Sequence, residues 1–416
     1  MRWIYPHKSV KSRKVFQAGS LIALSFASLT QAGPVTTVPW DGHTGAFSFT
    51  YDDARNTQIP NLIPQADGLG IKVTFFITNM YSFPSAKADW IKAAKNGHEL
   101  ANHTSDHGSP SGSNVSSMAS TLRALDPSVD AVTFAYPNCS VAGTSSVSAE
   151  SFMGRGCGQA TYAWDKAPGD WMNVQGLIIN SGAPTPGVNL VNSAKSANSW
   201  GLTIVHDVGP NPDQYSLTAA DNKKMLDAAV AAKVWIAPYA TVGAYYRAHF
   251  VMDAVTASGS GPWKLTWTSP HPKMPKVVKL RVKLAAATFG DAVEVSQGGT
   301  KVSQESDGSF VIDFMKLSLD VQKGGSSILD DSKFFKAAKV QIVRAGSQLQ
   351  VAGLPEGSYS YSFRTLSGQE VGNGTVRAQG AVESAQVPAP LHRGGLLMVI
   401  RSSEAATISV QVPPSI

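Results

Sequence analysis

The stretch that decides the fold is Ala46-Phe47-Ser48-Phe49-Thr50-Tyr51-Asp52-Asp53. Over 46–51 apolar and polar residues alternate as in a β-strand, and the acidic pair follows at the carboxyl-terminal end of this strand. A second run, 73–77, is apolar and β-branched, as is typical of a strand buried on both faces. A helical pattern over 58–69, ending at Gly70, separates the two. This order predicts parallel pairing of the strands.

The alternation of strand and helix patterns continues for about 210 residues, which predicts a parallel sheet or barrel of the α/β class. Further strands are predicted at 99–102, 131–136, 160–163, 177–179, 202–206 and 234–236, and further helices at 86–95, 116–125, 146–153 and 219–232. In such folds the chemistry collects at the carboxyl ends of the strands. Polar residues with catalytic potential lie there in this chain, which predicts one shared site.

Three of the nine histidines fall in the run from Gly97 to His107, and two of them, His103 and His107, are four residues apart. One carboxylate and two imidazoles form a ligand set suited to a divalent metal. A second carboxylate beside them could act as a general base. The pair Asp52 and Asp53 offers both carboxylates, one for each role.

Three segments in order carry a family resemblance: Thr50-Tyr51-Asp52-Asp53, His103-Thr104-Ser105-Asp106-His107 and Leu202-Thr203-Ile204-Val205-His206. Together they resemble motifs of the polysaccharide deacetylase family, the NodB-homology group also called carbohydrate esterase family 4. The likeness covers roughly residues 46–238. It implies a distorted (β/α) barrel and a metal-dependent deacetylase.

The resemblance also implies roles for individual residues. Asp53, His103 and His107 match the metal ligands, with zinc favoured and cobalt or another divalent ion as alternatives. Asp52 matches the general base that takes a proton from the attacking water, and His206 matches the general acid that protonates the leaving group. The metal would act as a Lewis acid on the acetyl carbonyl.

Two motifs depart from the family pattern. The third usually carries an arginine that orients the base, but Ala135 stands at that position, and we hypothesise that Arg155 supplies the guanidinium from another strand. The fourth is blurred, with Asp170-Trp171 as the better match and Asp165 as its competitor. Trp171 fits a substrate-binding role and a core position equally well.

Further substrate contacts are expected at Tyr136 and Asn138, in the loop where a backbone N–H could stabilise the oxyanion. His98 and Glu99 do not form an HExxH motif, so we interpret both as structural. Asp106 is expected to orient the loop between the two predicted histidine ligands.

Other classes of protein fit less well. A serine esterase would need a G-x-S-x-G elbow, which the chain lacks. A non-haem iron oxygenase also uses two histidines and a carboxylate, but it would leave Asp52 unexplained. A non-catalytic carbohydrate-binding surface protein is supported only by the missing third-motif arginine. The net charge of +6, without a basic stripe, argues against nucleic acid as a partner.

Residues 1–32 have the pattern of a cleaved signal peptide: a basic start, an apolar stretch over 15–29, and Thr30-Gln31-Ala32 before Gly33. No later stretch is expected to span a membrane. The chain is therefore predicted to be secreted, periplasmic or on the cell surface. In an oxidising compartment Cys139 and Cys157 are expected to form a disulfide, with two buried thiols as the alternative.

The composition changes beyond residue 250, where short strands and glycine turns dominate. We predict a catalytic domain at 33–250, a β-rich module at 251–330 and a β-sandwich-like module at 331–416, the last two contacting glycans or a surface. The favoured substrate is a polymer that contains N-acetylglucosamine, such as chitin, peptidoglycan or an exopolysaccharide. Acetylated xylan, an O-acetyl ester, is the alternative.

Overall fold

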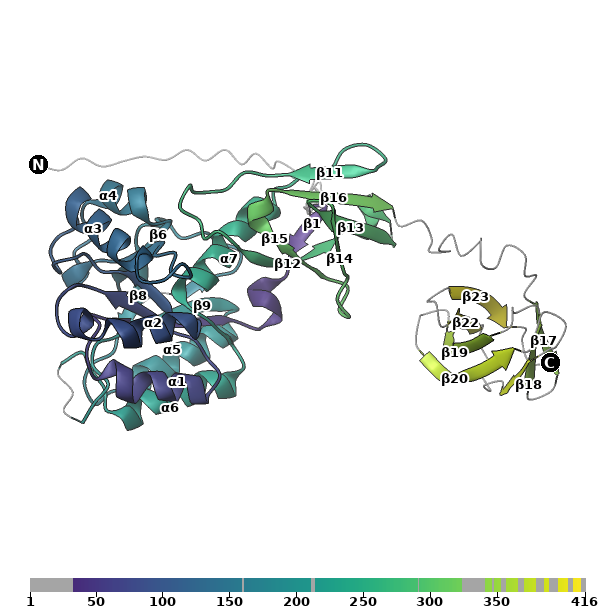
Figure 1. Ribbon diagram of the computed structural model, residues 1–416, viewed down its shortest axis with the longest axis horizontal. Helices are drawn as coiled ribbons and strands as arrows, with labels where there is room; N and C mark the ends of the chain where they lie inside the picture. The colour runs from purple at the N-terminus through teal and green to yellow at the C-terminus, as the bar shows by residue number, and fades with distance from the viewer. Residues whose placement is uncertain are drawn as a thin grey trace, which may run out of the picture. The chain divides into compact units, whose positions relative to one another are not determined.

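The computed structural model describes residues 33–158, 161–210, 214–290 and 292–323, and seven further strands between 341 and 412 (Figure 1). The predicted signal peptide, 1–32, lies outside the described residues. Residues 324–340, which include the predicted boundary between the two C-terminal modules, lie outside them as well.

Seven parallel strands close into a barrel, because the last of them pairs with the first. Around the barrel these are β2 (Ala46–Asp52), β3 (Thr74–Ile77), β4 (Glu99–Asn102), β5 (Thr133–Ala135), β6 (Met153–Cys157), β8 (Val174–Ile178) and β9 (Ser199–Val205). Two short strands extend the sheet: β10 (Trp235–Ile236) runs parallel to β2, and β7 (Thr161–Ala163) runs antiparallel to β9. The predicted (β/α) barrel is confirmed.

The register brings the carboxyl ends of the central strands to one level. Thr50 of β2 lies opposite Thr74 of β3 and Ile204 of β9. Asn102, the last residue of β4, lies opposite Ile77, the last residue of β3. The residues that follow these strands therefore emerge at the same end of the barrel.

Helices cover the outside of the barrel (Figure 1). They are α1 (Ile63–Gly68), α2 (Lys87–Lys95), α3 (Gly112–Arg123), α4 (Thr144–Glu150), α5 (Thr185–Ser196), α6 (Ala219–Ala232) and α7 (Tyr239–Met252). Their apolar sides pack on the strands: Trp90 of α2 meets Phe75 of β3 with ring centroids 5.0 Å apart. Both rings are fully buried, and each such burial stabilises the fold by about 1.5–3 kcal/mol.

Three elements of the barrel were not predicted. Helix α7 is buried on most of its surface and lacks the one-sided apolar pattern of a surface helix. Helix α5 was also missed, and so was β6, which has glycine at two of its five positions. The predicted strand at 160–163 exists as β7, but it is antiparallel and lies outside the closed barrel.

A second group of strands forms two antiparallel sheets, in the orders β1-β12-β15 and β11-β16-β13-β14. Their bounds are β1 (Val35–Thr37), β11 (Trp263–Thr266), β12 (Lys279–Leu284), β13 (Val293–Gln297), β14 (Thr300–Val302), β15 (Phe310–Asp313) and β16 (Ser318–Lys323), with α8 (Ala286–Phe289) between β12 and β13. Because β1 precedes the barrel in the chain but pairs with β12, this module draws on both sides of the barrel sequence. The boundary at 250/251 stays a prediction.

The C-terminal strands form two more antiparallel sheets, β17-β18-β21 and β20-β19-β22-β23. They are β17 (Gln341–Ala345), β18 (Gln348–Ala352), β19 (Gly357–Thr365), β20 (Glu370–Ala378), β21 (Ala385–Pro388), β22 (Leu396–Ser402) and β23 (Thr407–Val412). Along β19, Tyr359, Tyr361 and Phe363 are buried in strict alternation, as the period of a strand requires. The predicted β-rich character of this region is confirmed.

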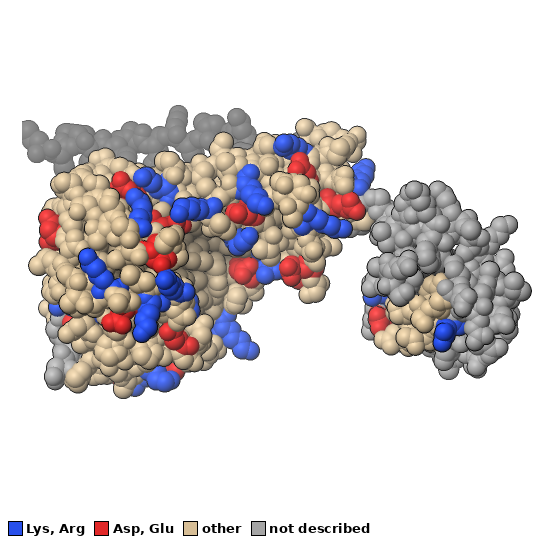
Figure 2. Space-filling model, in the orientation of Figure 1, with Lys and Arg blue, Asp and Glu red and all other residues tan. Residues whose placement is uncertain are grey.

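On the face of the molecule shown in Figure 2, acidic and basic side chains lie interspersed rather than in a stripe of one sign. Several form pairs, such as Lys72 with Asp67 at 2.6 Å and Arg123 with Glu150 at 2.7 Å. Among the described helices, none has both the length and the apolar composition needed to cross a membrane.

Candidate active site

The acidic pair lies where β2 ends. Asp53 and Ala54 adopt left-handed backbone angles, with φ of 74° and 54°, so the chain turns sharply after the strand. Non-glycine residues in this region cost of order 1–3 kcal/mol each, and such strain concentrates at functional sites. Both carboxylates are buried, with Asp52 at 3% and Asp53 at 2% exposure.

The first predicted histidine ligand follows β4 and has a defined orientation. His103 Nδ1 lies 2.8 Å from the carbonyl oxygen of Ala135, so this nitrogen carries the proton and donates it. The lone pair of Nε2 is then directed toward the acidic pair, 3.6 Å from Asp53 Oδ1. A backbone carbonyl in this position is the usual outer partner of a metal-binding histidine.

The second histidine reaches the same carboxylate oxygen. His107 has a φ of 54°, and its Nε2 lies 3.3 Å from Asp53 Oδ1. Asp106 accepts hydrogen bonds from the Gly108 N–H and from Asn114 Nδ2, both at 3.0 Å, and so shapes the loop between the two histidines. This contact pattern agrees with the orienting role predicted for Asp106.

The three groups fit a divalent metal. One ligand atom from each of Asp53, His103 and His107 lies within 4.8 Å of the other two. Ligands at about 2.0–2.2 Å in a tetrahedral zinc site are separated by ~3.3 Å, close to the measured 3.3 and 3.6 Å. Asp53 Oδ1 is also buried without a hydrogen-bond partner among the described groups, and a cation would satisfy it. The chemistry of the donor set therefore fits the metal site predicted from the sequence.

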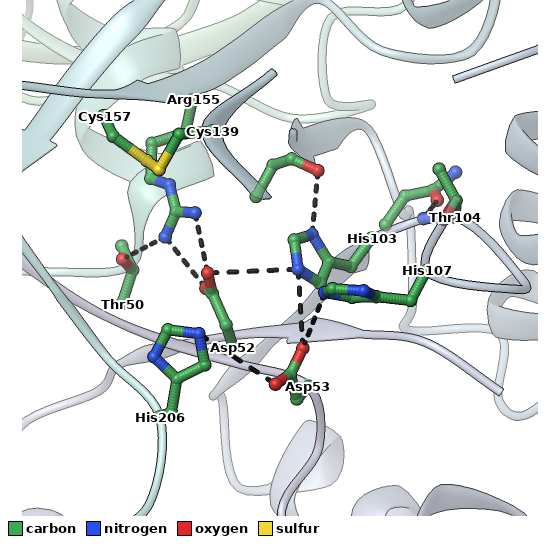
Figure 3. Close-up of polar contacts among 12 residues, drawn as sticks. Thr50, Asp52, Asp53, His103, Thr104, His107, Cys139, Arg155, Cys157 and His206 are labelled. Atoms are coloured by element: carbon green, nitrogen blue, oxygen red, sulfur yellow. Dashed lines mark hydrogen bonds and ion pairs between the residues drawn. A yellow bond between two sulfur atoms is a disulfide. The ribbon is translucent and has the colours of Figure 1, made fainter. Parts of the chain in front are cut away.

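Asp52 is held by an arginine from another strand (Figure 3). Arg155 Nη1 and Nη2 each donate to one oxygen of Asp52 at 2.8 Å, and Nη1 also donates to Thr50 Oγ1 at 3.0 Å. The guanidinium lies over the Phe76 ring, 4.9 Å from its centroid. In this position Asp52 Oδ2 is 4.0 Å from His103 Nε2, beside the metal cluster.

Arg155 lies next to Ala135, the position at which the family pattern has an arginine. Ala135 of β5 and Arg155 of β6 are register partners in the sheet, and neighbours in register point to the same face. The two residues therefore lie side by side at the same level of the barrel. The contact of Arg155 with Asp52 agrees with the orienting role hypothesised from the sequence.

The charges at the site set the protonation of its groups. Burial opposes ionisation of Asp52, but Arg155 and the nearby histidines outweigh it, so the pKa of Asp52 lies below its usual value. Burial is likewise outweighed at Asp53 by its contact with His107 and by the neighbouring cationic groups, and its pKa is well below the usual range. Burial lowers the pKa of His103, which keeps the ring neutral. The contact with Asp53 raises the pKa of His107.

His206 completes the cluster from β9. Its Nε2 lies 3.9 Å from Asp53 Oδ2, and Figure 3 shows it on the other side of the acidic pair from His107. The side-chain amide of Gln58 donates to the carbonyl oxygens of both Asp52 (2.7 Å) and His206 (2.8 Å), which ties the ends of β2 and β9 together. Nδ1 of His206 is buried with no hydrogen-bond partner among the described groups.

Arg55 was missed by the sequence analysis. Its guanidinium contacts Asp53 Oδ2 at 3.0 Å and lies 3.8 Å from an oxygen of Asp207. It thereby holds the second oxygen of Asp53 and leaves Oδ1 for the histidines. The sequence signal for Arg55 is weak, because an arginine two residues after an acidic pair can equally well be a solvated surface residue.

Of the three predicted substrate contacts, the structure corrects those of Tyr136 and Trp171. The Tyr136 side chain is 1% exposed, packed among Phe134, Val115 and Val147, and its backbone N–H already donates to the Arg155 carbonyl. Its ring therefore cannot meet a substrate, because apolar neighbours enclose it. Asn138 is exposed on the loop after β5, and its substrate-binding role stays a prediction.

Trp171 is placed away from the site. Its carbonyl accepts a hydrogen bond from Gly154 at the amino end of β6, so it lies at the end of the barrel opposite to the acidic pair. Its ring packs against Tyr246 and Phe250 of α7. The core interpretation therefore describes Trp171, and the predicted substrate-binding role is wrong. Asp170 accepts a hydrogen bond from the Met172 N–H at 2.8 Å.

Cys139 and Cys157 form the predicted disulfide, which joins the loop after β5 to the end of β6, two residues beyond Arg155. Asn138 and Cys139 both have left-handed backbone angles, with φ of 53° and 59°. The disulfide therefore pins a strained loop to the strand that carries the arginine.

Part of the barrel sequence matches a known family. Residues 41–147 match the family model described as polysaccharide deacetylase. A gellan lyase from a Bacillus species is 30% identical over 197 residues, which is 45% of this chain; the chain spans only 8% of the length of that relative.

Three solved structures of low identity are also similar. The catalytic domain of a peptidoglycan N-acetylglucosamine deacetylase from Eubacterium rectale is 18% identical, covers 47% of this chain and 88% of its own, and has a TM-score of 0.33. For the chitin deacetylase from Colletotrichum lindemuthianum these values are 14%, 47%, 86% and 0.33. For a family 4 carbohydrate esterase from Streptomyces lividans, solved with acetate, they are 14%, 46%, 91% and 0.31. Such likenesses do not bear on what this chain acts on.

The closed parallel barrel carries at its carboxyl end an Asp-His-His cluster that could hold a metal ion, and beside it a carboxylate held by an arginine. The match over residues 41–147 agrees with the resemblance of the three sequence motifs to the polysaccharide deacetylase family.

Proposed function

We propose that this protein is a metal-dependent carbohydrate deacetylase that removes acetyl groups from a polymer containing N-acetylglucosamine. The observation that carries the proposal is the position of Asp52. It is a buried carboxylate, ionised by Arg155 and left out of the ligand set, yet its Oδ2 lies 4.0 Å from His103 Nε2. Asp52 therefore lies where a carboxylate can take a proton from a group held at the cluster of Asp53, His103 and His107.

Asp52 acts as the general base. Its two oxygens each accept one N–H of Arg155, which fixes the plane of the carboxylate while each oxygen keeps a free lone pair. From beside the cluster of Asp53, His103 and His107 it takes the proton of the water that attacks the acetyl carbonyl. A correctly placed base of this kind contributes about 10²–10⁴-fold to the rate.

His206 acts as the general acid on the other side of the acidic pair. Its Nε2 faces Asp53 at 3.9 Å, and the side chain is 20% exposed, so a leaving amine or alcohol can approach it. Gln58 holds the backbone carbonyls of Asp52 and His206 together and thereby keeps the base and the acid at a constant separation.

The metal would be held by Asp53, His103 and His107, with zinc favoured for a site of one carboxylate and two imidazoles. Bound there, it supplies Lewis-acid polarisation of the carbonyl and stabilises the charge that develops on its oxygen. Arg55 and the Ala135 carbonyl hold Asp53 and His103 in the orientation that ligation requires.

The missing third-motif arginine was the only support for the non-catalytic alternative, and Arg155 supplies a guanidinium contact to Asp52 from the neighbouring strand. The acetylxylan alternative remains, since an amide and an ester both need the same base, acid and metal.

We further propose that the chain is exported and that its β-rich modules contact glycans or the cell surface. The signal-like start at 1–32 and the disulfide support export, because disulfides persist in oxidising compartments. Protein recovered from the medium or periplasm should begin at Gly33; a retained residue 1–32 segment in all of it would contradict export with cleavage.

The function is tested by acetate release from the purified protein, stripped of metal and resupplied with zinc or cobalt. The panel holds chitooligosaccharides, peptidoglycan and acetylated xylan, and the control is Asp52→Asn loaded to the same metal content. We expect metal-dependent release from an N-acetyl polymer, and release slower by about 10²–10⁴-fold from the control. Release from xylan alone would establish the ester alternative, and no release despite one bound metal per chain would refute a deacetylase.

A further inference from the structure

Exposed apolar side chains gather around the site. Among the described residues, the exposed large hydrophobic side chains are Met80, Tyr81, Val141, Tyr215, Val230 and Val277. The first four lie on the loops that follow β3, β5 and β9, at the carboxyl end of the barrel. Single exposed apolar residues are ordinary, but a group of them around a polar site marks a binding surface.

Two of these four are tyrosines that lie next to the two accessible histidines. The Tyr81 ring, 47% exposed, meets the His107 ring edge-on with centroids 6.4 Å apart. The Tyr215 ring, 38% exposed, lies 5.6 Å from the His206 ring at an interplanar angle of 38°. Because His107 and His206 lie on either side of the acidic pair in Figure 3, the tyrosines flank the site from two sides.

The loop of Tyr81 is fastened to the site. The guanidinium of Arg55 lies 3.8 Å from the centroid of the Tyr81 ring while it contacts Asp53, so a cation–π contact joins the ring to a predicted metal ligand. Ser82 donates a hydrogen bond to the carbonyl of Ala54. Because this exposed aromatic ring is already held in place, it loses little further conformational entropy when a ligand binds.

The ring of Tyr215 is placed by the return of its own loop. The backbone N–H of His206 donates to the carbonyl of Tyr215 at 2.9 Å, which brings the residue back over the strand end. Asp207 N–H likewise donates to Ser216 Oγ at 2.9 Å. Both tyrosines are therefore built into the rim of the site rather than attached to a free loop end.

We propose that Tyr81 and Tyr215 are sugar-stacking residues on the two sides of the metal cluster, so that the substrate binds as an internal stretch of at least three sugar units. This inference rests on the proposed deacetylase function. The C–H faces of pyranose rings are apolar, and a tyrosine offers a flat apolar face with a polar tip. The acetylated unit lies over the metal cluster, and its neighbour on each side meets one ring. A single sugar would meet neither.

The test measures binding and turnover separately. In the metal-loaded Asp52→Asn background, calorimetry gives the Kd of N-acetylglucosamine oligomers from two to six units. We expect affinity to rise from dimer to trimer and then level off. Tyr81→Ala and Tyr215→Ala should each weaken binding of the hexamer by roughly fivefold, from the ~0.5–1.5 kcal/mol of an aromatic contact. Tyr81→Phe and Tyr215→Phe, which keep the ring, should bind as the parent does.

Val230→Ala on α6 is the matched control for loss of an exposed apolar side chain away from the site, and metal content verifies that each variant is intact. Hexamer affinity that is unchanged in both alanine variants would overturn the inference while acetate release by the wild type still stands. Equal losses in the alanine and phenylalanine variants would also overturn it, because the hydroxyl rather than the ring would then be the contact. Absence of acetate release from every polymer would refute the proposed function itself, and the inference with it.

Discussion

Both ends of the barrel hold a buried histidine beside carboxylates, and the two ends differ in how those groups are satisfied. At the amino end, His98 accepts from the Val73 N–H through Nδ1 and faces Asp67 through Nε2 at 3.1 Å. Glu99 accepts hydrogen bonds from Thr74, Thr133 and the Ala240 N–H, which occupy both of its oxygens.

At the carboxyl end the partners are incomplete. Asp53 Oδ1 and His206 Nδ1 are buried without hydrogen bonds among the described groups, and Asp53 and His107 have left-handed backbones. Buried polar groups are costly unless paired, so a fully paired cluster is structural, whereas an unpaired and strained one is kept for a ligand or reaction. Residue type alone does not separate the two ends, but pairing does.

Replacement of the histidines, His103 at one end and His98 at the other, is expected to give the largest difference in metal content and activity between the two ends of the barrel. His103→Ala removes one of the three proposed ligands, so metal should be lost and acetate release should fall to background. His98→Gln at the other end should keep metal and activity and lose about 1–3 kcal/mol of stability from the broken buried hydrogen bonds. Metal content by plasma mass spectrometry and acetate release check both. A fully metallated His103→Ala would exclude His103 as a ligand.

The next difference concerns the carboxylates. Asp52→Asn should lower turnover by about 10²–10⁴-fold and keep the metal, because the base is lost while the ligands remain. Glu99→Gln should change turnover less than about twofold, since all partners of Glu99 belong to the barrel itself. The measurement is kcat with equal metal loading. Retained turnover in Asp52→Asn would remove Asp52 as the base.

A third test concerns Arg155, a positioning residue. Arg155→Ala leaves Asp52 buried without its partner, so we expect kcat to fall by roughly 10²-fold with a smaller change in KM, and stability to fall by about 3–5 kcal/mol. Arg155→Lys keeps the charge but loses the two-pronged contact and should be intermediate. The double variant Ala135→Arg/Arg155→Ala should recover part of kcat, because the new side chain starts at the neighbouring register position. Arg155→Ala with wild-type kcat would show that Asp52 does not need this orientation.

The smallest effect is one of pH and sharpens the view of the amino end. Burial outweighs the three donors and raises the pKa of Glu99 above its ordinary value of 4.5. The folded state then holds this proton to higher pH than the unfolded chain, so the contribution to stability is full below pH 4.5 and is lost as pH rises through the folded pKa. The wild type should lose a few °C of Tm relative to Glu99→Gln from pH 4.5 upward, measured by calorimetry. Parallel pH profiles would contradict this.

The sequence predicted the parts of the site that lie along single strands. The acidic pair follows an alternating strand, and the two histidines are four apart, so their shared end of the barrel follows from parallel pairing. The barrel itself followed from the alternation of strand and helix patterns. The disulfide was predicted from the compartment and the number of cysteines.

What could not be predicted depends on packing. Strand β6 was missed because its glycines have low strand propensity; they are present because a Cβ at Gly154 would lie 2.7 Å from the Met172 carbonyl oxygen. Trp171 follows an acidic residue as a motif would require, but only the fold shows that it precedes β8 and lies at the wrong end. Arg55 takes its meaning from contacts with Asp53 and Tyr81, which are local but directional.

The arginine that holds Asp52 is Arg155 rather than a residue at position 135, and this bears on how barrels of this kind are compared. In the interior of a barrel a neighbour on the adjacent strand is about 4.8 Å away, closer than the next inward-facing residue along the same strand, which is about 6.6 Å away. A guanidinium on the adjacent strand can therefore reach the same carboxylate, as Arg155, the register partner of Ala135, reaches Asp52. An alignment by sequence position would score Ala135 as a lost arginine. A comparison of the inward-facing positions of the barrel would also count the guanidinium of Arg155.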